Sequence, residues 1–122
     1  MEDKFYLEFP LKKEFFTTIR LTAGGICSQA GFDIEDIEDF KLCVSEACLI
    51  LMRNDYCKAF VEFKINGGLS AIISGGDCKK NNDMNDEIAE NISLSLINEL
   101  VSEVEFVKQD KILKQIKLVL KR

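Results

Sequence analysis

The segment IEDFKLCVSEACLILMRNDY, Ile37 to Tyr56, decides the fold of this chain. Its apolar residues recur at steps of three and four, which is the stripe of an amphipathic helix packed on a core. Asp33 can begin that helix, because its side chain can accept a hydrogen bond from a free backbone N–H. Glu46 and Ile50 are four residues apart and therefore share one face of the helix. The stripe consists of Ile37, Phe40, Val44, Ala47, Cys48 and Leu51.

The residues on either side of this helix predict strands and two further helices. Gly31 suits the end of a helix that begins after Pro10, and the pair Gly24-Gly25 inside that helix predicts a close packing contact or a kink. Asn66-Gly67-Gly68 between two alternating segments is typical of a β-hairpin. The expected elements are strand 4–9, helix 11–30, the central helix, strands 59–65 and 69–73, helix 86–101, and strands 104–109 and 113–121.

This order predicts an α+β fold, a two-layer α/β sandwich in which a mixed or antiparallel sheet has its helices on one face. With 122 residues, 47% hydrophobic and 30% charged, the chain fits one domain, residues 1–122, with its own core. No apolar run approaches the roughly 20 residues that span a membrane, and the start MEDKFYLEF lacks the features of a signal peptide. We therefore expect a cytosolic protein.

Charge and cysteine content exclude several classes of function. A net charge of −5 and a pI of about 4.8 disfavour DNA or RNA as a direct partner, since phosphate binding needs clustered Lys and Arg. The basic segment KILKQIKLVLKR at residues 111–122 is expected to be an edge strand with solvated lysines, with a phosphate-binding strip as the alternative. Five cysteines at irregular spacing, in a chain without histidine, predict no metal site. Cys27, Cys43 and Cys48 are expected to be small buried apolar residues, whereas Cys78 is expected in a loop, where it can react.

Three segments carry a resemblance to a known family: IRLTAGGI at residues 19–26, IEDFKLCVSEAC at residues 37–48, and ISLSLINELVSEVEFV at residues 92–107. They resemble the anti-sigma-factor serine/threonine kinases of the GHKL, or Bergerat-fold, ATPase superfamily. The resemblance implies a histidine-kinase-like ATPase fold. It also implies a central helix with the pattern S-E-A-x-x-N, in which Glu is the general base and Asn ligates magnesium. Here Ser45, Glu46 and Ala47 match that pattern, and Ile50 stands at the Asn position.

The nucleotide-binding positions implied by the resemblance are degraded. Magnesium demands oxygen ligands, which the side chain of Ile50 does not offer. In the second family motif, D-x-G-x-G after a strand, Gly75 falls at the position of the adenine-binding aspartate. Gly76 and Asp77 follow, so Asp77 lies two residues after that position. A shifted register of the strand would still bring Asp77 to the adenine. The glycines of the phosphate loop are replaced at positions 91 and 93, and the loop 78–87 is short for an ATP lid. We expect a degenerate pseudoenzyme without a cofactor.

The resemblance implies a regulatory module that binds a sigma factor or an anti-sigma-factor antagonist. Arg20 matches an arginine in the part of the family that docks partners, and a homodimer through the first strand and first helix is expected. The alternative is an active kinase that uses Mg-ATP, with Glu46 as the general base and Asp77 on the adenine. A non-catalytic partner of an intact kinase, or a domain that binds another small ligand, are further alternatives.

Each of these site residues also has a plainer interpretation. Glu46 can be a solvated carboxylate or an ion-pair partner of Lys41 or Arg53 on the same helix. Arg20 can be ordinary helix surface, and Asp77 can be a turn residue. Ile50 is interpreted as a core residue in either case.

Overall fold

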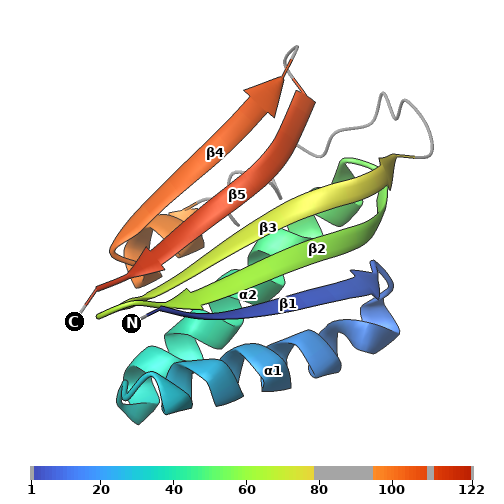
Figure 1. The fold of residues 1–122 in the computed structure, drawn as a ribbon. Helices are drawn as coiled ribbons and strands as arrows, with labels where there is room; N and C mark the ends of the chain where they lie inside the picture. Colours follow the sequence, from blue (N-terminus) through green and yellow to red (C-terminus); the bar gives the residue numbers. More distant parts are fainter. Residues whose placement is uncertain (1, 79–94, 110–111, 122) are drawn as a thin grey trace.

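A computed structural model describes residues 2–78, 95–109 and 112–121, with the backbone alone at residues 77 and 78 (Figure 1). Its sheet has five strands in the order β1-β2-β3-β5-β4, and every neighbouring pair is antiparallel. The expected α+β class is confirmed, with an antiparallel rather than a mixed sheet. The elements are β1 Asp3–Pro10, the 3-10 turn η1 Lys13–Phe15, α1 Phe16–Gln29, α2 Ile34–Arg53, β2 Tyr56–Ile65, β3 Leu69–Cys78, β4 Glu103–Gln109 and β5 Ile112–Leu120; residues 95–100 are also helical.

The central helix α2 begins as its sequence predicts. The Oδ1 atom of Asp33 accepts a hydrogen bond from the backbone N–H of Asp36 at 2.9 Å, which caps the helix. Most of the predicted stripe is fully buried, and only Ile37 is partly exposed. The ring of Phe40 lies 6.2 Å from that of Phe63 on β2, so α2 packs directly on the sheet.

The first helix starts later than predicted because Pro10 and Leu11 stay with the sheet. Pro10 is the last residue of β1, and the N–H of Leu11 donates to the carbonyl of Cys57 at 2.8 Å. That bond holds Leu11 beside β2, so the chain first turns through η1 and α1 begins at Phe16. The predicted end is confirmed, since Gly31 has φ +89°, a conformation that glycine adopts without a Cβ clash.

The predicted hairpin between β2 and β3 is confirmed, but both strands are longer than expected. Gly67 has φ +71°, and the N–H of Asn66 donates to the carbonyl of Gly68 at 3.1 Å. At the other end, Gly75 pairs with Ala59, and the ladder extends to Cys78 opposite Tyr56. The second strand therefore continues past the predicted end at residue 73, and both the interpretation of Asp77 as a turn residue and the expected loop position of Cys78 are wrong.

The C-terminal segment forms an interior strand, so its predicted edge position is wrong. β5 lies between β3 and β4, and the two edges of the sheet are β1 and β4 (Figure 1). Alternation reports which side chains share a face, but it does not report how many neighbours a strand has. The partly exposed residues that alternate with the buried residues of β5 lie on the face of the sheet that α1 and α2 do not cover, and they do not indicate an edge.

Helices α1 and α2 cover one face of the sheet, and β strands form the other layer (Figure 1). Inward residues such as Val61, Phe63, Ala71 and Ile73 are buried beneath the helices.

Of the predicted helix 86–101, residues 95–100 are described and are helical, with Ile97 fully buried. Residues 86–94, with positions 91 and 93 and most of the expected short lid, lie outside the described residues. In the described part of the chain, no helix has the length and apolar character needed to cross a membrane.

Candidate functional site

The S-E-A segment lies in the middle of α2, with Ser45 and Ala47 buried and Glu46 half-buried. Ile50 is 0% exposed and belongs to the hydrophobic core, as its interpretation as a core residue predicts. Glu46, one turn earlier, is half-buried. The position that the resemblance assigns to a magnesium ligand is thus filled by a buried hydrocarbon side chain. Among the described residues, no group of three or more His, Cys, Asp or Glu side chains is arranged to hold a metal ion.

Gly75 and Gly76 leave room for two aromatic rings on opposite faces of β3. A Cβ atom on Gly75 would lie 2.3 Å from Cγ of Tyr56, and one on Gly76 would lie 2.4 Å from Cε2 of Phe60. Gly75 is opposite the buried Ala59, so the Tyr56 ring occupies the helix-covered side of the sheet. These glycines therefore have a packing reason within the protein itself. Asp77 lies in β3, and its side chain is outside the description.

Tyr56 is a site residue that sequence reasoning missed. Its hydroxyl donates to the backbone carbonyl of Leu113 on β5 at 2.6 Å, and its side chain is buried. The ring is consequently fixed over Gly75, where the resemblance places the adenine-binding aspartate. The only sequence signal was an aromatic residue shortly after the central helix, followed at positions 75 and 76 by a glycine pair.

Arg20 connects α1 to the S-E-A segment of α2, a link that the sequence did not predict. Its Nη1 donates to Oγ of Ser45 at 3.2 Å, and its Nη2 lies 3.5 Å from Oγ1 of Thr17. Ser45 is only 5% exposed, and Arg20 itself is half-buried. The interpretation of Arg20 as ordinary exposed surface is therefore too simple, because the guanidinium satisfies a nearly buried hydroxyl.

A groove of about 560 Å³ runs between α1 and α2 beside Arg20. Leu21 is 65% exposed and Leu42 is 40% exposed, so the rim is apolar although it faces solvent. The lining also carries charge of both signs, including the Lys41–Glu38 ion pair at 3.1 Å. The full lining is Thr17, Arg20, Leu21, Glu38, Asp39, Lys41 and Leu42.

The two glycines of α1 differ in their surroundings. A Cβ atom on Gly24 would lie 2.8 Å from Cδ of Lys41, so Gly24 provides the predicted close contact between the helices. A Cβ atom on Gly25 would meet no other atom within 4 Å. Gly25 is exposed on the outer side of α1, and nothing in the structure explains a glycine there.

The predicted buried cysteines are confirmed as core residues. Burial raises the pKa of Cys43 and of Cys48 to about 12, and nearby Asp39 and Glu46 add to the effect on Cys43. Burial, with Asp36 and Asp33 beside it, raises the pKa of Cys27 to about 11. These thiols stay protonated near neutral pH and are poor nucleophiles. Cys57, at the start of β2, is partly exposed.

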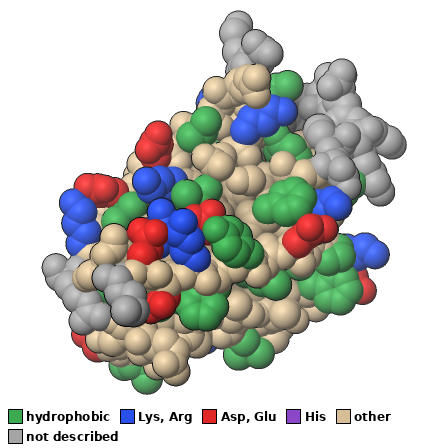
Figure 2. Space-filling model, in the orientation of Figure 1, with side chains coloured by type: hydrophobic (Ala, Val, Ile, Leu, Met, Phe, Trp, Pro, Cys, Tyr) green, Lys and Arg blue, Asp and Glu red, His purple; other side chains and the backbone are tan. Residues whose placement is uncertain are grey.

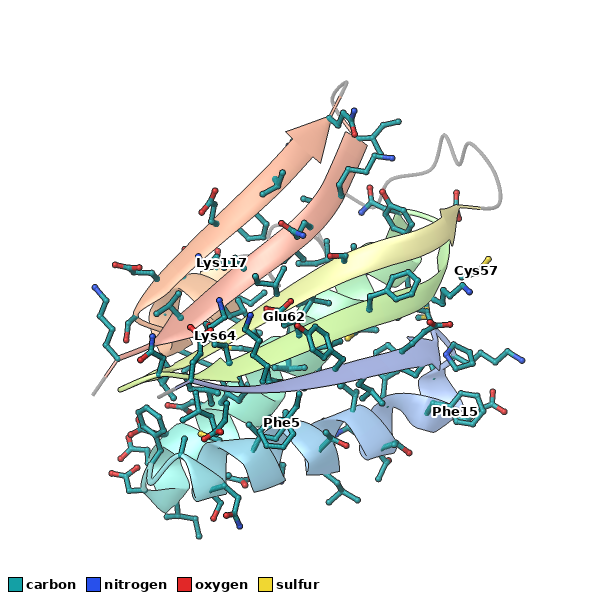
Figure 3. All side chains as sticks on the ribbon, viewed as in Figure 1. Phe5, Phe15, Cys57, Glu62, Lys64 and Lys117 are labelled. Atoms are coloured by element: carbon teal, nitrogen blue, oxygen red, sulfur yellow. The ribbon has the colours of Figure 1, made fainter. Side chains whose placement is uncertain are left out.

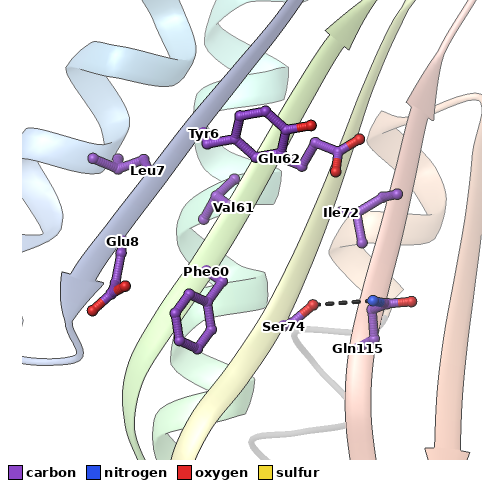
Figure 4. A pocket seen from close by; sticks show the side chains of 9 residues that line it. All are labelled: Tyr6, Leu7, Glu8, Phe60, Val61, Glu62, Ile72, Ser74 and Gln115. Atoms are coloured by element: carbon purple, nitrogen blue, oxygen red, sulfur yellow. Dashed lines mark hydrogen bonds between the residues drawn. The ribbon is translucent and has the colours of Figure 1, made fainter.

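The uncovered face of the sheet contains a hollow of about 430 Å³ that sequence reasoning missed (Figure 4). Tyr6 and Glu62 lie side by side on neighbouring strands, and Phe60 lies beside Ser74. The amide of Gln115 donates to Oγ of Ser74 at 3.0 Å across the floor. Lys58 forms an ion pair with Glu8 at 3.3 Å and lies 5.7 Å from the centre of the Phe60 ring.

Comparison with known proteins gives partial matches to one kind of protein. No family model matches the chain. Serine-protein kinase RsbW of Bacillus cereus (strain AH187) is 37% identical over 67 residues, which are 55% of this chain and 42% of the relative. Serine-protein kinase RsbW of Bacillus thuringiensis (strain Al Hakam) matches to the same extent. The chain spans less than half the length of these relatives. Over the matched part, it is homologous to RsbW serine-protein kinases.

Proposed function

We propose that this chain is an anti-sigma-factor-like regulatory protein that binds a sigma factor or an anti-sigma-factor antagonist, with weakened or lost ATP binding. The observation that carries the proposal is a contrast within α2. Ser45 is engaged by Arg20 beside an open groove, whereas Ile50 closes the metal position with a core side chain. The homology to RsbW serine-protein kinases supports the choice of family. A cytoplasmic location belongs to the same proposal.

The groove between α1 and α2 is the proposed docking surface for the partner. Arginine is enriched at the residues that dominate binding energy, and such residues work best inside an apolar rim that excludes water. Arg20 uses two of its nitrogen atoms on Ser45 and Thr17, so further guanidinium N–H groups can bind a partner carboxylate. Leu21 and Leu42 supply exposed apolar surface on either side. A partner helix with an acidic residue between apolar residues has the complementary chemistry.

Two features of the described residues support weak or absent ATP binding. Magnesium keeps near-octahedral oxygen coordination, and Ile50 supplies no oxygen at the metal position. The ring of Tyr56 covers Gly75, which stands where the resemblance expects the adenine-binding aspartate. To admit a nucleotide there, the ring would have to break its hydrogen bond with Leu113 and leave the core.

An active serine/threonine kinase, using Mg-ATP, is the second candidate function. It is favoured by one observation: Glu46 is half-buried rather than fully buried, at the position of the general base. A carboxylate there can accept a proton only if the acceptor hydroxyl comes within hydrogen-bond reach. Transfer of labelled phosphate from Mg-ATP to an antagonist protein, abolished in a Glu46→Gln variant, would establish this candidate.

The proposal is tested by direct binding to individually produced partners. Each sigma factor and each antagonist protein from the same genome is titrated against the purified chain. We expect one of them to bind, and we expect Arg20→Glu to weaken that binding by about tenfold or more. Lys12→Glu changes the same kind of charge at an exposed position outside the groove and is expected to bind normally. Equal binding by Arg20→Glu would refute the docking surface.

A thermal-shift titration tests the nucleotide half of the proposal separately. A ligand that binds only the folded state raises the melting temperature. We expect no magnesium-dependent shift with Mg-ATP or Mg-ADP. A clear shift would favour the kinase candidate and would leave the docking surface to be judged by the binding experiment.

Self-association is also proposed, because the resemblance implies a homodimer. The resemblance implies that the first strand and the first helix form the contact between the two copies. The groove lies on the helix side of the molecule, so a dimer that uses the other side of the sheet would leave it open.

A further inference from the structure

The hollow on the outer face of the sheet is acidic, and the proposed function makes no use of it (Figure 4). Figure 2 shows hydrophobic, basic and acidic side chains interspersed on this side of the molecule. Of the described residues that line the hollow itself, two are glutamates and none is basic. Its volume of about 430 Å³ is within the range of pockets that hold small molecules. The hollow therefore has both the size and the charge to select a ligand.

Two aromatic rings and two carboxylates alternate on β1 and β2 at this hollow. Tyr6 of β1 is the register partner of Glu62 of β2. Two residues further along, Glu8 of β1 is the register partner of Phe60 of β2. Residues two apart on a strand point to the same face, so the four side chains share the outer face. Tyr6 is 70% exposed and Phe60 is 41% exposed, so each ring is open to a ligand beside a carboxylate.

The protein's own Lys58 already occupies one of these two pairs of ring and carboxylate. Its Nζ atom lies 3.3 Å from Oε2 of Glu8 and 5.7 Å from the centre of the Phe60 ring. An ammonium is attracted to the face of an aromatic ring as well as to a carboxylate. The pair of Glu8 and Phe60 is therefore an ammonium site within this protein, and the second pair, at Glu62, offers the same chemistry.

The carboxylate of the second pair has no lysine or arginine of its own. Among the residues that the structure describes, none forms an ion pair with Glu62. Figure 3 shows Lys64 and Lys117 on the same face, but both line a separate hollow beside the turn of the β2–β3 hairpin. Lys64 lies 4.0 Å from Glu2. Lys117 is in register with Glu105. Glu62 is half-buried, so a counter-ion from outside is attracted more strongly than at a fully solvated carboxylate.

The floor of the hollow adds an apolar surface and a hydrogen-bond acceptor. Nε2 of Gln115 donates to Oγ of Ser74 at 3.0 Å, and the Oε1 atom of the same amide can accept an N–H from a ligand. Figure 4 shows Ile72 between Glu62 and this amide. A ligand in the hollow thus meets acceptors for its charged end and hydrocarbon for the rest of its surface.

These groups suit an organic cation better than a metal ion or an anion. Magnesium and calcium need several oxygen ligands, and carboxylates repel anions. A carboxylate beside aromatic rings instead matches an ammonium that carries an apolar body. We propose that the hollow binds a small organic ammonium ion, with its charged end at Glu62 and its apolar body against the rings of Tyr6 and Phe60.

This inference goes beyond the proposed function and does not depend on it. The hollow is on the outer face of the sheet, whereas the Arg20 groove is between the two helices that cover the other face. The Arg20→Glu variant is therefore expected to bind the ammonium ion as wild type does. Loss of partner binding and loss of ligand binding are separate results.

The test is a titration of the full isotope-labelled chain with phenethylamine, a cation at neutral pH that carries a ring. Nuclear magnetic resonance of the backbone amides reports where the ligand binds. We expect saturable shifts around the hollow and a dissociation constant on the order of a millimolar, because an ammonium gains little from one exposed ring or carboxylate. Phenethyl alcohol and phenylacetate, its neutral and anionic counterparts, are expected to bind at least about tenfold more weakly.

Substitutions on the outer face assign the binding to named side chains. Glu62→Gln removes the charge with little change in shape and is expected to weaken binding about tenfold. Tyr6→Leu removes a ring and is expected to weaken binding about twofold to fivefold, whereas Tyr6→Phe keeps most of the affinity. Glu105→Gln is the control, because it removes a carboxylate from the same face outside the hollow, and unchanged binding is expected. Circular dichroism verifies that each variant is folded.

Several results would overturn the inference. They are shifts that do not saturate, equal binding of phenethyl alcohol, equal binding by Glu62→Gln, and an equal loss in Glu62→Gln and Glu105→Gln. A lysine-containing peptide that binds at the hollow while phenethylamine does not would also overturn it, because the hollow would then receive a side chain of a partner protein instead of a small ligand.

Discussion

The guanidinium of Arg20 on α1 donates a hydrogen bond to the hydroxyl of Ser45 on α2 at 3.2 Å. The bond joins a half-buried cation to a nearly buried hydroxyl in the S-E-A segment. Arg20 is thereby held in one orientation beside the groove, which lowers the entropy that a partner must remove on binding. Stability and the proposed partner recognition therefore involve the same pair of residues.

Ser45→Ala is expected to lower the free energy of unfolding by about 1 to 2 kcal/mol, because a hydrogen bond to a charged group is lost in a largely buried place. Urea denaturation followed by circular dichroism measures the change. Thr17→Ala is the control, because its contact with Arg20 is longer, at 3.5 Å, and exposed. Equal losses in the two variants would contradict a special role for Ser45.

Gly24→Ala and Gly25→Ala form a matched pair in the same helix. Replacing an exposed helical glycine with alanine gains up to about 1 kcal/mol, so Gly25→Ala is expected to raise the melting temperature. In Gly24→Ala the same gain is offset, because the new methyl group displaces the stem of Lys41. Thermal unfolding of both variants compares them directly. A larger gain at position 24 would contradict the helix contact described here.

Gly75→Ala and Gly76→Ala test the two aromatic rings on β3. A Cβ atom at position 75 would collide with the buried, hydrogen-bonded ring of Tyr56, so this variant is expected to lose about 1 to 3 kcal/mol of stability. At position 76 the obstacle is the partly exposed ring of Phe60, which can move outward at a lower cost. Chemical denaturation gives both values. An equal effect would show that the Tyr56 ring is not held in place.

Ile50→Asn restores the residue that the kinase pattern carries at the metal position. We expect loss of stability by about 2 to 5 kcal/mol, because a large apolar side chain leaves the core and an amide is buried in its place. We expect no gain in Mg-ATP binding while Tyr56 covers Gly75. A magnesium-dependent rise in melting temperature with ATP, found in this variant and not in wild type, would show that the nucleotide site needs only one reversion.

The buried thiols make stability fall at alkaline pH. The pKa of Cys43 and of Cys48 is about 12 in the folded protein, against an ordinary value of 9.0. A raised folded pKa favours the protonated state, so this contribution is complete below pH 9 and is lost as pH rises from there toward 12. Unfolding measured between pH 8 and pH 11 is expected to show the decline, by comparison with a Cys43→Ala, Cys48→Ala double variant whose decline is shallower.

Much of the helix layer was predictable because its signals are local. The cap by Asp33, the stripe of α2, the end of α1 at Gly31 and the hairpin turn at Gly67 each depend on a few adjacent residues.

What could not be predicted depends on contacts between distant residues. The interior position of β5 is decided by pairing with β3 and β4, which no local pattern records. The strand was predicted to end at residue 73, yet the ladder continues through Gly75 and Gly76, which leave space for rings of the preceding strand. The bond between Arg20 and Ser45 spans 25 positions along the chain and was invisible for the same reason.

The position of β5 between β3 and β4 has a consequence for synthesis on the ribosome. β4 is made before β5, but β5 is its neighbour in the sheet, so β4 has no strand to join when it leaves the exit tunnel. The edge of β3 likewise stays open until residues 112–120 have been translated. The nascent chain must therefore keep an apolar strand edge from pairing with other polypeptides during that interval, which makes the time between synthesis of β3 and synthesis of β5 the period of exposure to aggregation and of need for a chaperone.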